Sequence, residues 1–243
     1  MFFFSGWSMS IKKAYHVIRG VLYASLFCLS VFAFANEHHF EVISLGSQCL
    51  PARQLEIYKI SSGYYPFDWA VTQFDALMSV LKNDFKNFGE KENLKVVGHE
   101  ITNADGTKSI QKWVVDTKYN ISYPHGIPAF DNINQEFSCF DAKQKRRIKR
   151  FYDTISSGKH IFFFRHLISK SQAIKLRNLL DKKFPSLKYT LVATDYTDEI
   201  KTDWNLKKIK NFYLGKPIND WDEQVADIAQ NWPRIFTTLG LLN

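Results

Sequence analysis

The chain has 243 residues, of which 32 are Lys or Arg and 24 are Asp or Glu, so its formal net charge at pH 7 is +8. The length fits one domain with a sizeable core. The excess charge is modest for a chain of this size, so it permits attraction to anionic envelopes or glycans but does not call for nucleic acid.

The first 35 residues have the pattern of a secretory signal peptide. Lys12, Lys13 and Arg19 form a basic region, residues 21–35 are apolar, and the chain then reaches the small-x-small site 33–35. Fifteen apolar residues are short for a membrane helix. We therefore expect cleavage after Ala35, a mature domain at 36–243, no stable membrane span and a periplasmic or secreted protein. Retention of the segment as a membrane anchor is the alternative.

A short strand followed by a helix places Cys49 where a thiol can be activated. Residues 42–45 predict a buried strand, Gly46 and Ser47 a turn, and Pro51 the first turn of a helix that runs to about residue 60. The helix N-terminus and Arg53 on the same face would favour a thiolate at Cys49. Two alternatives stay open: Cys49 as a small buried apolar residue, and a disulfide between Cys49 and Cys139.

The middle of the chain predicts a second helix, a hairpin and a third helix. Thr72 and Asp75 form a capping-box pattern, and apolar residues at helical spacing follow over 74–88. The NADG sequence at 103–106 indicates a hairpin turn, and residues 113–123 predict a strand. A Ser138–Asp141 cap starts the third helix.

The last hundred residues alternate between helices and strands. Strands are expected at 161–164, 189–193 and 209–214. Helices are expected from a Ser169–Gln172 cap to Phe184 and from an Asn219–Asp222 cap through Trp232. This order predicts an α/β fold, a single-domain three-layer sandwich with a largely parallel central sheet and an antiparallel hairpin insert.

Five motifs occur in an order that resembles a known family. They are ISLGSQCLPARQL, PFDW at 66–69, DTKYNISYPH ending at His125, RRIKRF followed by IFFFR, and DW at 203–204. Together they resemble the bacterial family named putative papain-like cysteine peptidases, which has no established function. The resemblance implies a Cys49–His125 pair. The family pattern has Asp after the histidine, whereas this chain has Gly126. A nucleophile after the first strand is also similar to SGNH-type hydrolases rather than to papain.

If the predicted strands are parallel neighbours, their carboxyl ends bring the chemical groups together. Cys49, His125 and the Arg165–His166 pair each follow such a strand. A histidine near the thiol could take its proton, and a carboxylate could orient the imidazole. Asp68 is favoured for that role because PFDW surrounds it with apolar bulk; the other candidates are Asp116, Asp131 and Asp203. A turn-stabilising Asp68 is the alternative.

The remaining side chains give substrate contacts but no cofactor. We expect Arg53, Arg165 and Trp69 to contact the substrate; Arg165 would clamp an anionic group or pair with Asp203. The basic run 143–150 is expected to be a solvated helix face. GSQC is too short for a phosphate loop, and His99, His160 and His166 lack metal-ligand spacing, so we expect no metal and no cofactor.

The sequence thus predicts an exported cysteine hydrolase or acyl-transfer enzyme in which Cys49 is the nucleophile, His125 the base and Asp68 the orienting group. Its substrate would be an anionic peptide or an envelope glycan. The rival hypothesis is a non-catalytic, envelope-associated binding domain that uses Arg165 with Tyr64, Tyr65 and Trp69. The oligomeric state is not predicted.

Overall fold

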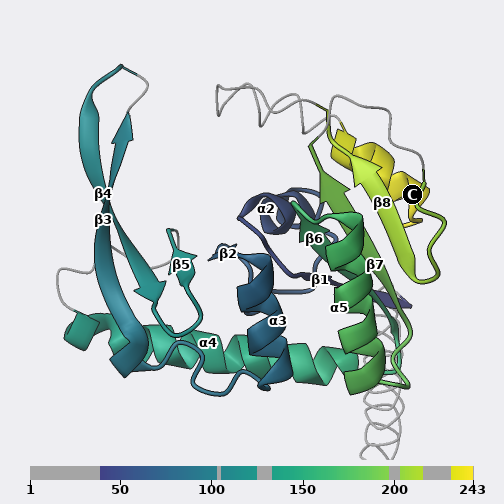
Figure 1. The fold of residues 1–243 in the computed structure, drawn as a ribbon, viewed down its shortest axis with the longest axis horizontal. Helices are drawn as coiled ribbons and strands as arrows, with labels where there is room; N and C mark the ends of the chain where they lie inside the picture. The colour runs from purple at the N-terminus through teal and green to yellow at the C-terminus, as the bar shows by residue number, and fades with distance from the viewer. Residues whose placement is uncertain (1–38, 103–104, 125–132, 197–202, 216–230, 243) are drawn as a thin grey trace, which may run out of the picture. The chain divides into compact units, whose positions relative to one another are not determined.

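A parallel sheet of four strands occupies the right-hand part of Figure 1. The computed structural model describes residues 39–102, 105–124, 133–196, 203–215 and 231–242, and its elements belong to one compact unit that begins at Phe40. Sheet A has the strand order β1-β6-β7-β8, and every neighbouring pair is parallel. The strands are β1 (Phe40–Ser44), β6 (His160–His166), β7 (Tyr189–Asp195) and β8 (Ile209–Tyr213).

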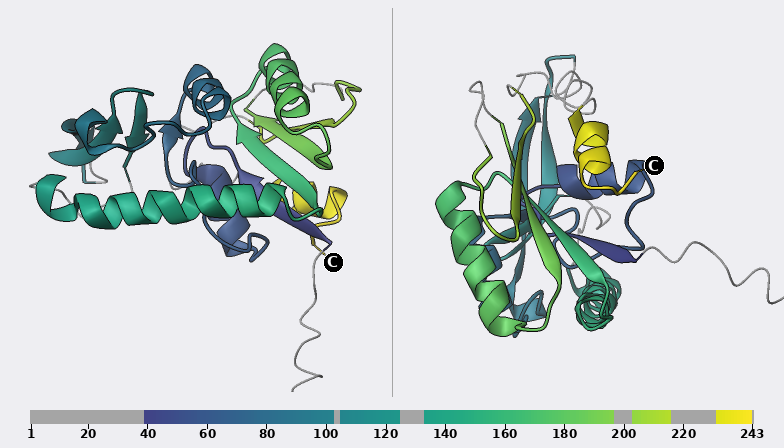
Figure 2. Two further views of the ribbon diagram at one scale, coloured as in Figure 1. Left: turned by 90° about the horizontal axis from the view of Figure 1, so that it is seen from below. Right: turned by 90° about the vertical axis from the view of Figure 1, so that its right-hand side faces the viewer.

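Both faces of sheet A are covered, because successive side chains of each strand point to opposite faces. One face carries Ile43, Phe163 and Leu191 and packs against α3 (Phe74–Lys82), α4 (Ile133–Ile155) and α5 (Lys170–Lys183). The other face carries Val42, Phe164 and Val192 and packs against α2 (Leu50–Ile57) and the helical residues 231–238. Figure 2 shows the sheet between these layers. The predicted α/β sandwich is therefore confirmed.

A second, antiparallel sheet forms the insert between β1 and β6. Sheet B has the order β2-β5-β4-β3. Its strands are β2 (Val71–Thr72), β3 (Leu94–Thr102), β4 (Lys108–Asp116) and β5 (Ile121–Tyr123), and the short 3-10 helix η1 (Lys91–Asn93) precedes β3. Strands β3 and β4 pair along their whole lengths. The hairpin insert is confirmed, although residues 103–104 of its turn lie outside the described chain.

The prediction of one strand over residues 113–123 is wrong. Asp116 ends β4, because its carboxylate accepts hydrogen bonds from the backbone N–H groups of Lys118 and Tyr119. Asn120 then adopts a positive φ of 54°. Asp stabilises turns by accepting hydrogen bonds from nearby backbone N–H groups, and Asn tolerates a positive φ. These local preferences outweigh the alternation of apolar residues that suggested a continuous strand.

Two of the predicted helix caps are also wrong, and one is confirmed. Thr72 lies in β2, and α3 instead starts after Gln73. Ser138 lies inside α4, which begins at Ile133. The Ser169–Gln172 capping box of α5 is present. The Asn219–Asp222 cap lies outside the described residues, and α2 ends at Ile57 rather than near residue 60.

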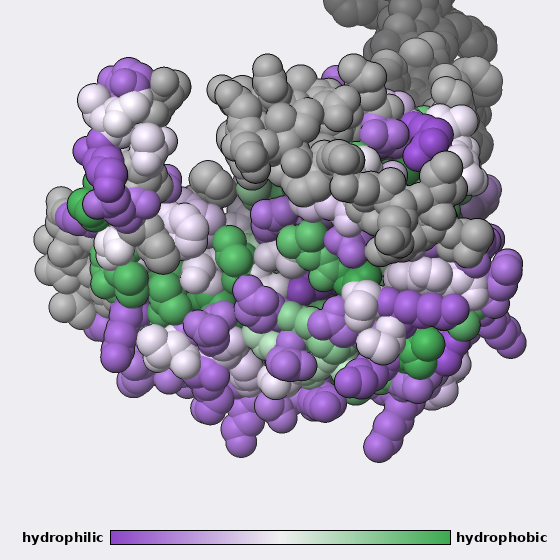
Figure 3. All heavy atoms as spheres, turned by 45° about the horizontal axis from the view of Figure 1, so that its top comes forward, coloured by the Kyte–Doolittle hydropathy of each residue, from purple (hydrophilic) through white to green (hydrophobic). Residues whose placement is uncertain are grey.

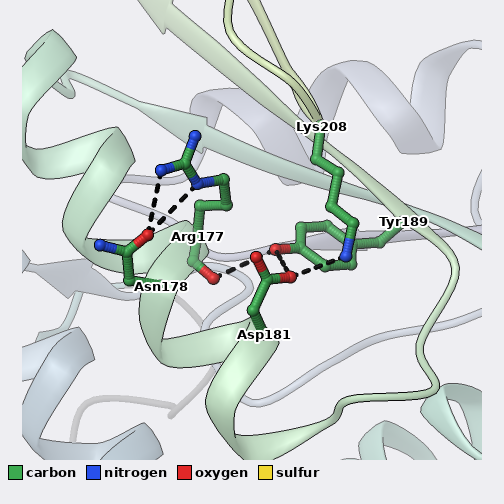
Figure 4. A network of polar contacts seen from close by, with 5 residues as sticks. All are labelled: Arg177, Asn178, Asp181, Tyr189 and Lys208. Carbon is green, nitrogen blue, oxygen red and sulfur yellow. Dashed lines mark hydrogen bonds and ion pairs between the residues drawn. The ribbon is translucent and has the colours of Figure 1, made fainter.

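A polar network fixes α5 against the parallel sheet (Figure 4). Asp181 on α5 accepts a hydrogen bond from the Tyr189 hydroxyl at 2.8 Å and pairs with Lys208 at 2.7 Å. The Tyr189 hydroxyl also contacts the backbone carbonyl of Arg177 at 3.2 Å. These contacts join one helix to the starts of β7 and β8, at the edge opposite the carboxyl ends of the strands.

The surface is mixed rather than uniformly polar. On the face drawn in Figure 3, apolar residues gather in several patches separated by hydrophilic ones. Exposed apolar side chains on the β3–β4 hairpin include Val96, Val97 and Ile110. Among the helices of the described residues, none is both long and apolar enough to cross a membrane.

Candidate active site

Cys49 lies at the point where the chain leaves sheet A and enters α2. It is the N-cap residue of that helix, and Pro51 occupies the first turn, as the sequence predicted. Its carbonyl accepts the backbone N–H of Arg53 at 2.9 Å. The thiol is neither fully buried nor fully exposed, and it is free of any disulfide. Cys49 therefore sits on the carboxyl edge of β1, where open α/β sheets place their ligand sites.

The resting state of this thiol differs from the predicted thiolate. Burial raises the pKa of Cys49 above its usual range, and this effect outweighs the helix-start backbone and Arg53, which both lower it. The expectation of a lowered pKa considered only the two favourable charges and missed desolvation. Cys49 is thus a protonated thiol near pH 7 and needs a base to become a nucleophile.

Two further strands end beside Cys49, as the parallel arrangement predicted. The His166 backbone N–H at the end of β6 donates to the Gly46 carbonyl at 3.0 Å. The His166 ring packs edge-on against Tyr196, just beyond β7, with centroids 4.7 Å apart. Burial first, and then the negative charge that Cys49 carries when ionised, raise the pKa of Tyr196 to about 12. The sequence had not indicated Tyr196.

Arg165 is buried and hydrogen-bonds to both sheets, and it is not exposed to bind a substrate. Its side chain is 1% exposed, and its guanidinium donates to the backbone carbonyls of Leu45 at 2.7 Å and Thr72 at 2.6 Å. Asp203 is exposed, and its carboxylate accepts the N–H of Asn205 instead. The alternative of an Arg165–Asp203 ion pair is therefore wrong.

Among the described residues, His166 is the histidine that lies at the carboxyl edge of sheet A, but its imidazole is neutral. It is fully buried, and its Nδ1 lies 3.1 Å from the Thr194 hydroxyl. Burial, with help from the Arg165 charge, lowers the pKa of His166 to about 3. A neutral imidazole with so low a pKa accepts a proton poorly, so His166 is better suited to packing Tyr196 than to acting as a base.

The predicted base, His125, lies outside the described residues. The strand that precedes it, β5, belongs to antiparallel sheet B and not to sheet A. The expectation that His125 follows a parallel neighbour of β1 is therefore wrong. The two sheets do meet close to Cys49, because the Thr72 N–H on β2 donates to the Ser47 carbonyl at 2.7 Å.

Asp68 is a buried carboxylate close to α2. It is 4% exposed, and its Oδ2 accepts the Tyr65 N–H at 2.7 Å, as the turn-stabilising alternative proposed. Its Oδ1 has no hydrogen-bond partner among the described residues. Burial raises the pKa of Asp68 to about 7, although Tyr65, Arg147 and Ser44 each oppose that rise. Asp68 therefore exchanges protons near neutral pH.

A cavity of about 260 Å³ lies between α2 and the segment 61–64, and Asp68 forms part of its wall. On the helix side it is lined by Ala52, Leu55 and Glu56. Residues 49, 52 and 56 follow helical spacing, so Cys49 and this wall lie on the same side of α2. At 1.5 Å per residue, the cavity begins about 5 Å along the helix from Cys49.

The basic run 143–150 is only partly a solvated face. Arg147 donates to the Asp68 carbonyl at 3.3 Å, and its guanidinium lies 5.5 Å from the centre of the Tyr64 ring. Arg150 donates to the Tyr64 carbonyl at 3.0 Å. The run therefore supports the cavity wall from α4, a role that its charge pattern alone did not suggest.

Arg53 and Trp69, the two other predicted substrate contacts, are both half-buried. Arg53 lies on α2, one turn beyond Cys49. Trp69 has a φ of 62°, a backbone conformation that is uncommon outside glycine. Their roles in substrate binding stay predictions.

The described residues also bear on a metal site and on a disulfide. No group of three or more His, Cys, Asp or Glu side chains there is arranged to hold a metal ion. Cys139 is exposed and also free, so the alternative of a Cys49–Cys139 disulfide is wrong.

Comparisons with known proteins agree with the motifs. The family model described as "Putative papain-like cysteine peptidase (DUF1796)" matches residues 40–199. An uncharacterised protein of Acanthamoeba polyphaga mimivirus is 32% identical over 135 residues, which is 51% of this chain and 60% of that protein. The chain thus spans less than two thirds of that relative. No solved structure is a significant match.

Proposed function

Because the chain belongs to the family described as putative papain-like cysteine peptidases, we propose that it is a hydrolase or acyl-transfer enzyme whose nucleophile is Cys49. The observation that carries the proposal is the position of Cys49. Cys49 is the partly accessible N-cap residue of α2 at the carboxyl edge of a parallel sheet, and a cavity large enough for a side chain or a small group begins about 5 Å farther along the helix. The bacterial origin and the export of the chain are not part of this support.

The reaction follows from the chemistry of a thiol at a helix start. A base takes the Cys49 proton, the sulfur attacks a carbonyl carbon, and the leaving amine or alcohol departs with a proton from the base. Backbone N–H groups at the start of α2 can stabilise the oxyanion, although Pro51 supplies none. Water, or another acceptor nucleophile, then releases the acyl group and restores the thiol.

We keep His125 as the proposed base. It rests on the family motif and not on geometry, whereas His166 is disfavoured by its low pKa. Since Asp68 titrates near pH 7, it can support the site either as a carboxylate or as an acid.

Single variants test the assignment. Cys49→Ser and His125→Ala should each lower the rate of acyl transfer from a generic acyl ester by a factor of about 100 or more. His166→Gln should lower it by less than tenfold, provided that the variant folds. Equal losses for both histidine variants, in folded proteins, would make His166 the base and overturn the His125 assignment.

The non-catalytic binding domain is the second candidate. The raised pKa of Cys49 favours it, because a protonated, partly buried thiol is typical of an inert cysteine. The anionic substrate that Arg165 suggested gains no support, since that side chain is 1% exposed. If full-length Cys49→Ser retains every measurable property of the wild type, the binding domain is the better description.

Export of the mature chain also stays a proposal. It rests on the basic and apolar pattern of residues 12–35. The intact mass of the protein recovered from its native host would show whether the chain starts at Asn36.

A further inference from the structure

The cavity beside α2 has hydrogen-bond acceptors but few free donors. Three hydroxyl groups line it, and each has already used its proton. Ser61 donates to the Gly63 carbonyl at 2.7 Å, Ser62 donates to Glu41 at 2.7 Å, and Tyr64 donates to Glu56 at 2.6 Å. What these oxygens still offer to a ligand is lone pairs.

The carboxylates of the wall add to this bias. Asp68 is buried, and its Oδ1 makes no well-formed hydrogen bond among the described residues, although the Ser44 hydroxyl and the Arg147 charge act on the same carboxyl group. Glu56 contributes a second carboxylate from the helix side. Among the lining residues the one cation is Lys59, which is exposed and follows the end of α2, while Arg147 and Arg150 lie behind the wall and bind its backbone carbonyls.

The walls are held in place from outside the cavity. Arg150 binds the Tyr64 carbonyl, and Arg147 binds the Asp68 carbonyl, so α4 supports the segment from Tyr64 to Asp68. The Tyr64–Glu56 hydrogen bond joins that segment to α2. A cavity whose walls are already fixed needs little ordering when a ligand binds.

We propose that this cavity binds a primary ammonium or guanidinium group, such as the side chain of a lysine or arginine residue of the substrate. The group would donate hydrogen bonds to Asp68 and Glu56. It would lie on the same side of α2 as Cys49. Only the identification of the ligand as part of a substrate rests on the proposed function, because binding in the cavity does not need the thiol. It reverses the charge of the substrate expected from Arg165.

Binding can be measured separately from catalysis in the full chain carrying Cys49→Ala. The probes are Nα-acetyl-lysine methylamide and the matched Nα-acetyl-norleucine methylamide, which lacks the amine, and the readout is the Kd from an NMR titration at pH 8. The lysine probe should bind about tenfold more tightly or better, and Asp68→Asn should remove most of that preference. Equal affinities for the two probes would overturn the proposal.

Two exposed positions keep the test decisive if Asp68→Asn does not fold. Glu56→Gln should weaken binding of the lysine probe, whereas Lys59→Ala should strengthen it, because a like charge is removed. If the lysine probe binds Lys59→Ala more weakly than the protein that keeps Lys59, the proposal is contradicted, because removal of a positive charge should favour a cationic ligand. Glu92→Gln, an exposed change on η1, is the matched control and should leave Kd unchanged. Lysine binding by Cys49→Ala, together with no acylation of Cys49 in the wild-type chain, would support the cavity and reject the proposed function.

Discussion

Asp68 and His166 are two buried ionisable residues whose pKa values move in opposite directions. Burial favours the neutral form of each, so it raises the pKa of Asp68 to about 7 and lowers the pKa of His166 to about 3. The two residues therefore affect stability in different pH ranges and with opposite signs. Each can be tested by one substitution.

Asp68 should destabilise the fold as pH rises. Its folded pKa is above the unfolded value of 3.8, so its contribution to the free energy of unfolding is full below pH 4 and falls until pH exceeds about 7. The pKa shift corresponds to about 4 kcal/mol at most. Relative to wild type, Asp68→Asn should thus gain stability between pH 4 and pH 8, measured by urea unfolding. A constant difference across that range would mean that Asp68 titrates normally.

His166 should destabilise the fold as pH falls. Its folded pKa is below the unfolded value of 6.5, so stability is full above pH 6.5 and decreases toward pH 3, by about 5 kcal/mol in total. His166→Gln cannot gain a proton, so its urea midpoint should vary less than that of wild type between pH 6.5 and pH 4. His39→Gln is the control, because that side chain is exposed. The same acid sensitivity in all three proteins would contradict this role.

At the scale of elements, the link between the sheets sets the position of α2. Gly46 has a φ of +81°, and a Cβ atom there would lie 3.0 Å from the Arg165 guanidinium. Glycine is therefore required twice, once by the backbone and once by the close approach of Arg165. Arg165 binds the carbonyl of Leu45, which directly precedes the turn that leads to Cys49. It also binds the carbonyl of Thr72 on β2, whose N–H donates to Ser47 in that turn.

Replacing Arg165 should loosen this link. Arg165→Lys can keep at most one of the two carbonyl contacts in good geometry, so we expect a loss of about 2 kcal/mol in the free energy of unfolding. Arg177→Lys, at a partly exposed position on α5, should cost less than about 0.5 kcal/mol. Urea unfolding of both variants checks the difference. Equal and small losses would show that the Arg165 contacts do not stabilise the fold.

The elements that the sequence predicted well are those with a strong apolar pattern. The run at 161–164 gave a strand buried on both faces, and the Ser169–Gln172 pair gave the start of α5. The errors occurred where local polar chemistry or pairing between sheets decides the structure. Asp116 divides an alternating stretch into two strands, and Thr72 bonds to Ser47 instead of capping a helix. The Asp116 turn is local and has a signal in Asp116 and Asn120, whereas the sequence around Thr72 gives no sign of its bond to Ser47.

The candidate site was predictable in part for the same reason. Cys49 and the Arg165–His166 pair converge because parallel strands end at one edge. The protonated state of Cys49 was missed because desolvation depends on packing from distant segments. Tyr196 and the supporting role of Arg147 also arise from packing alone. His125 and its role as a base rest on the family motif.

For the whole molecule, the described elements form one unit that begins at Phe40. We therefore expect that the chain produced from Asn36 onward folds without the first 35 residues and unfolds in a single cooperative transition. Circular dichroism during urea unfolding tests this. Two separated transitions would indicate that 36–243 is not one domain.

The most direct test of the central claim is acylation of Cys49 by p-nitrophenyl acetate, followed by peptide mapping with mass spectrometry at pH 7.5. The protein should gain one acetyl group on Cys49, faster in the folded protein than in the urea-unfolded one, and then lose it to water. The exposed thiol of Cys139 is the internal comparison. Acetylation confined to Cys139 and lysines, or an equal rate at Cys49 in the unfolded chain, would contradict the account.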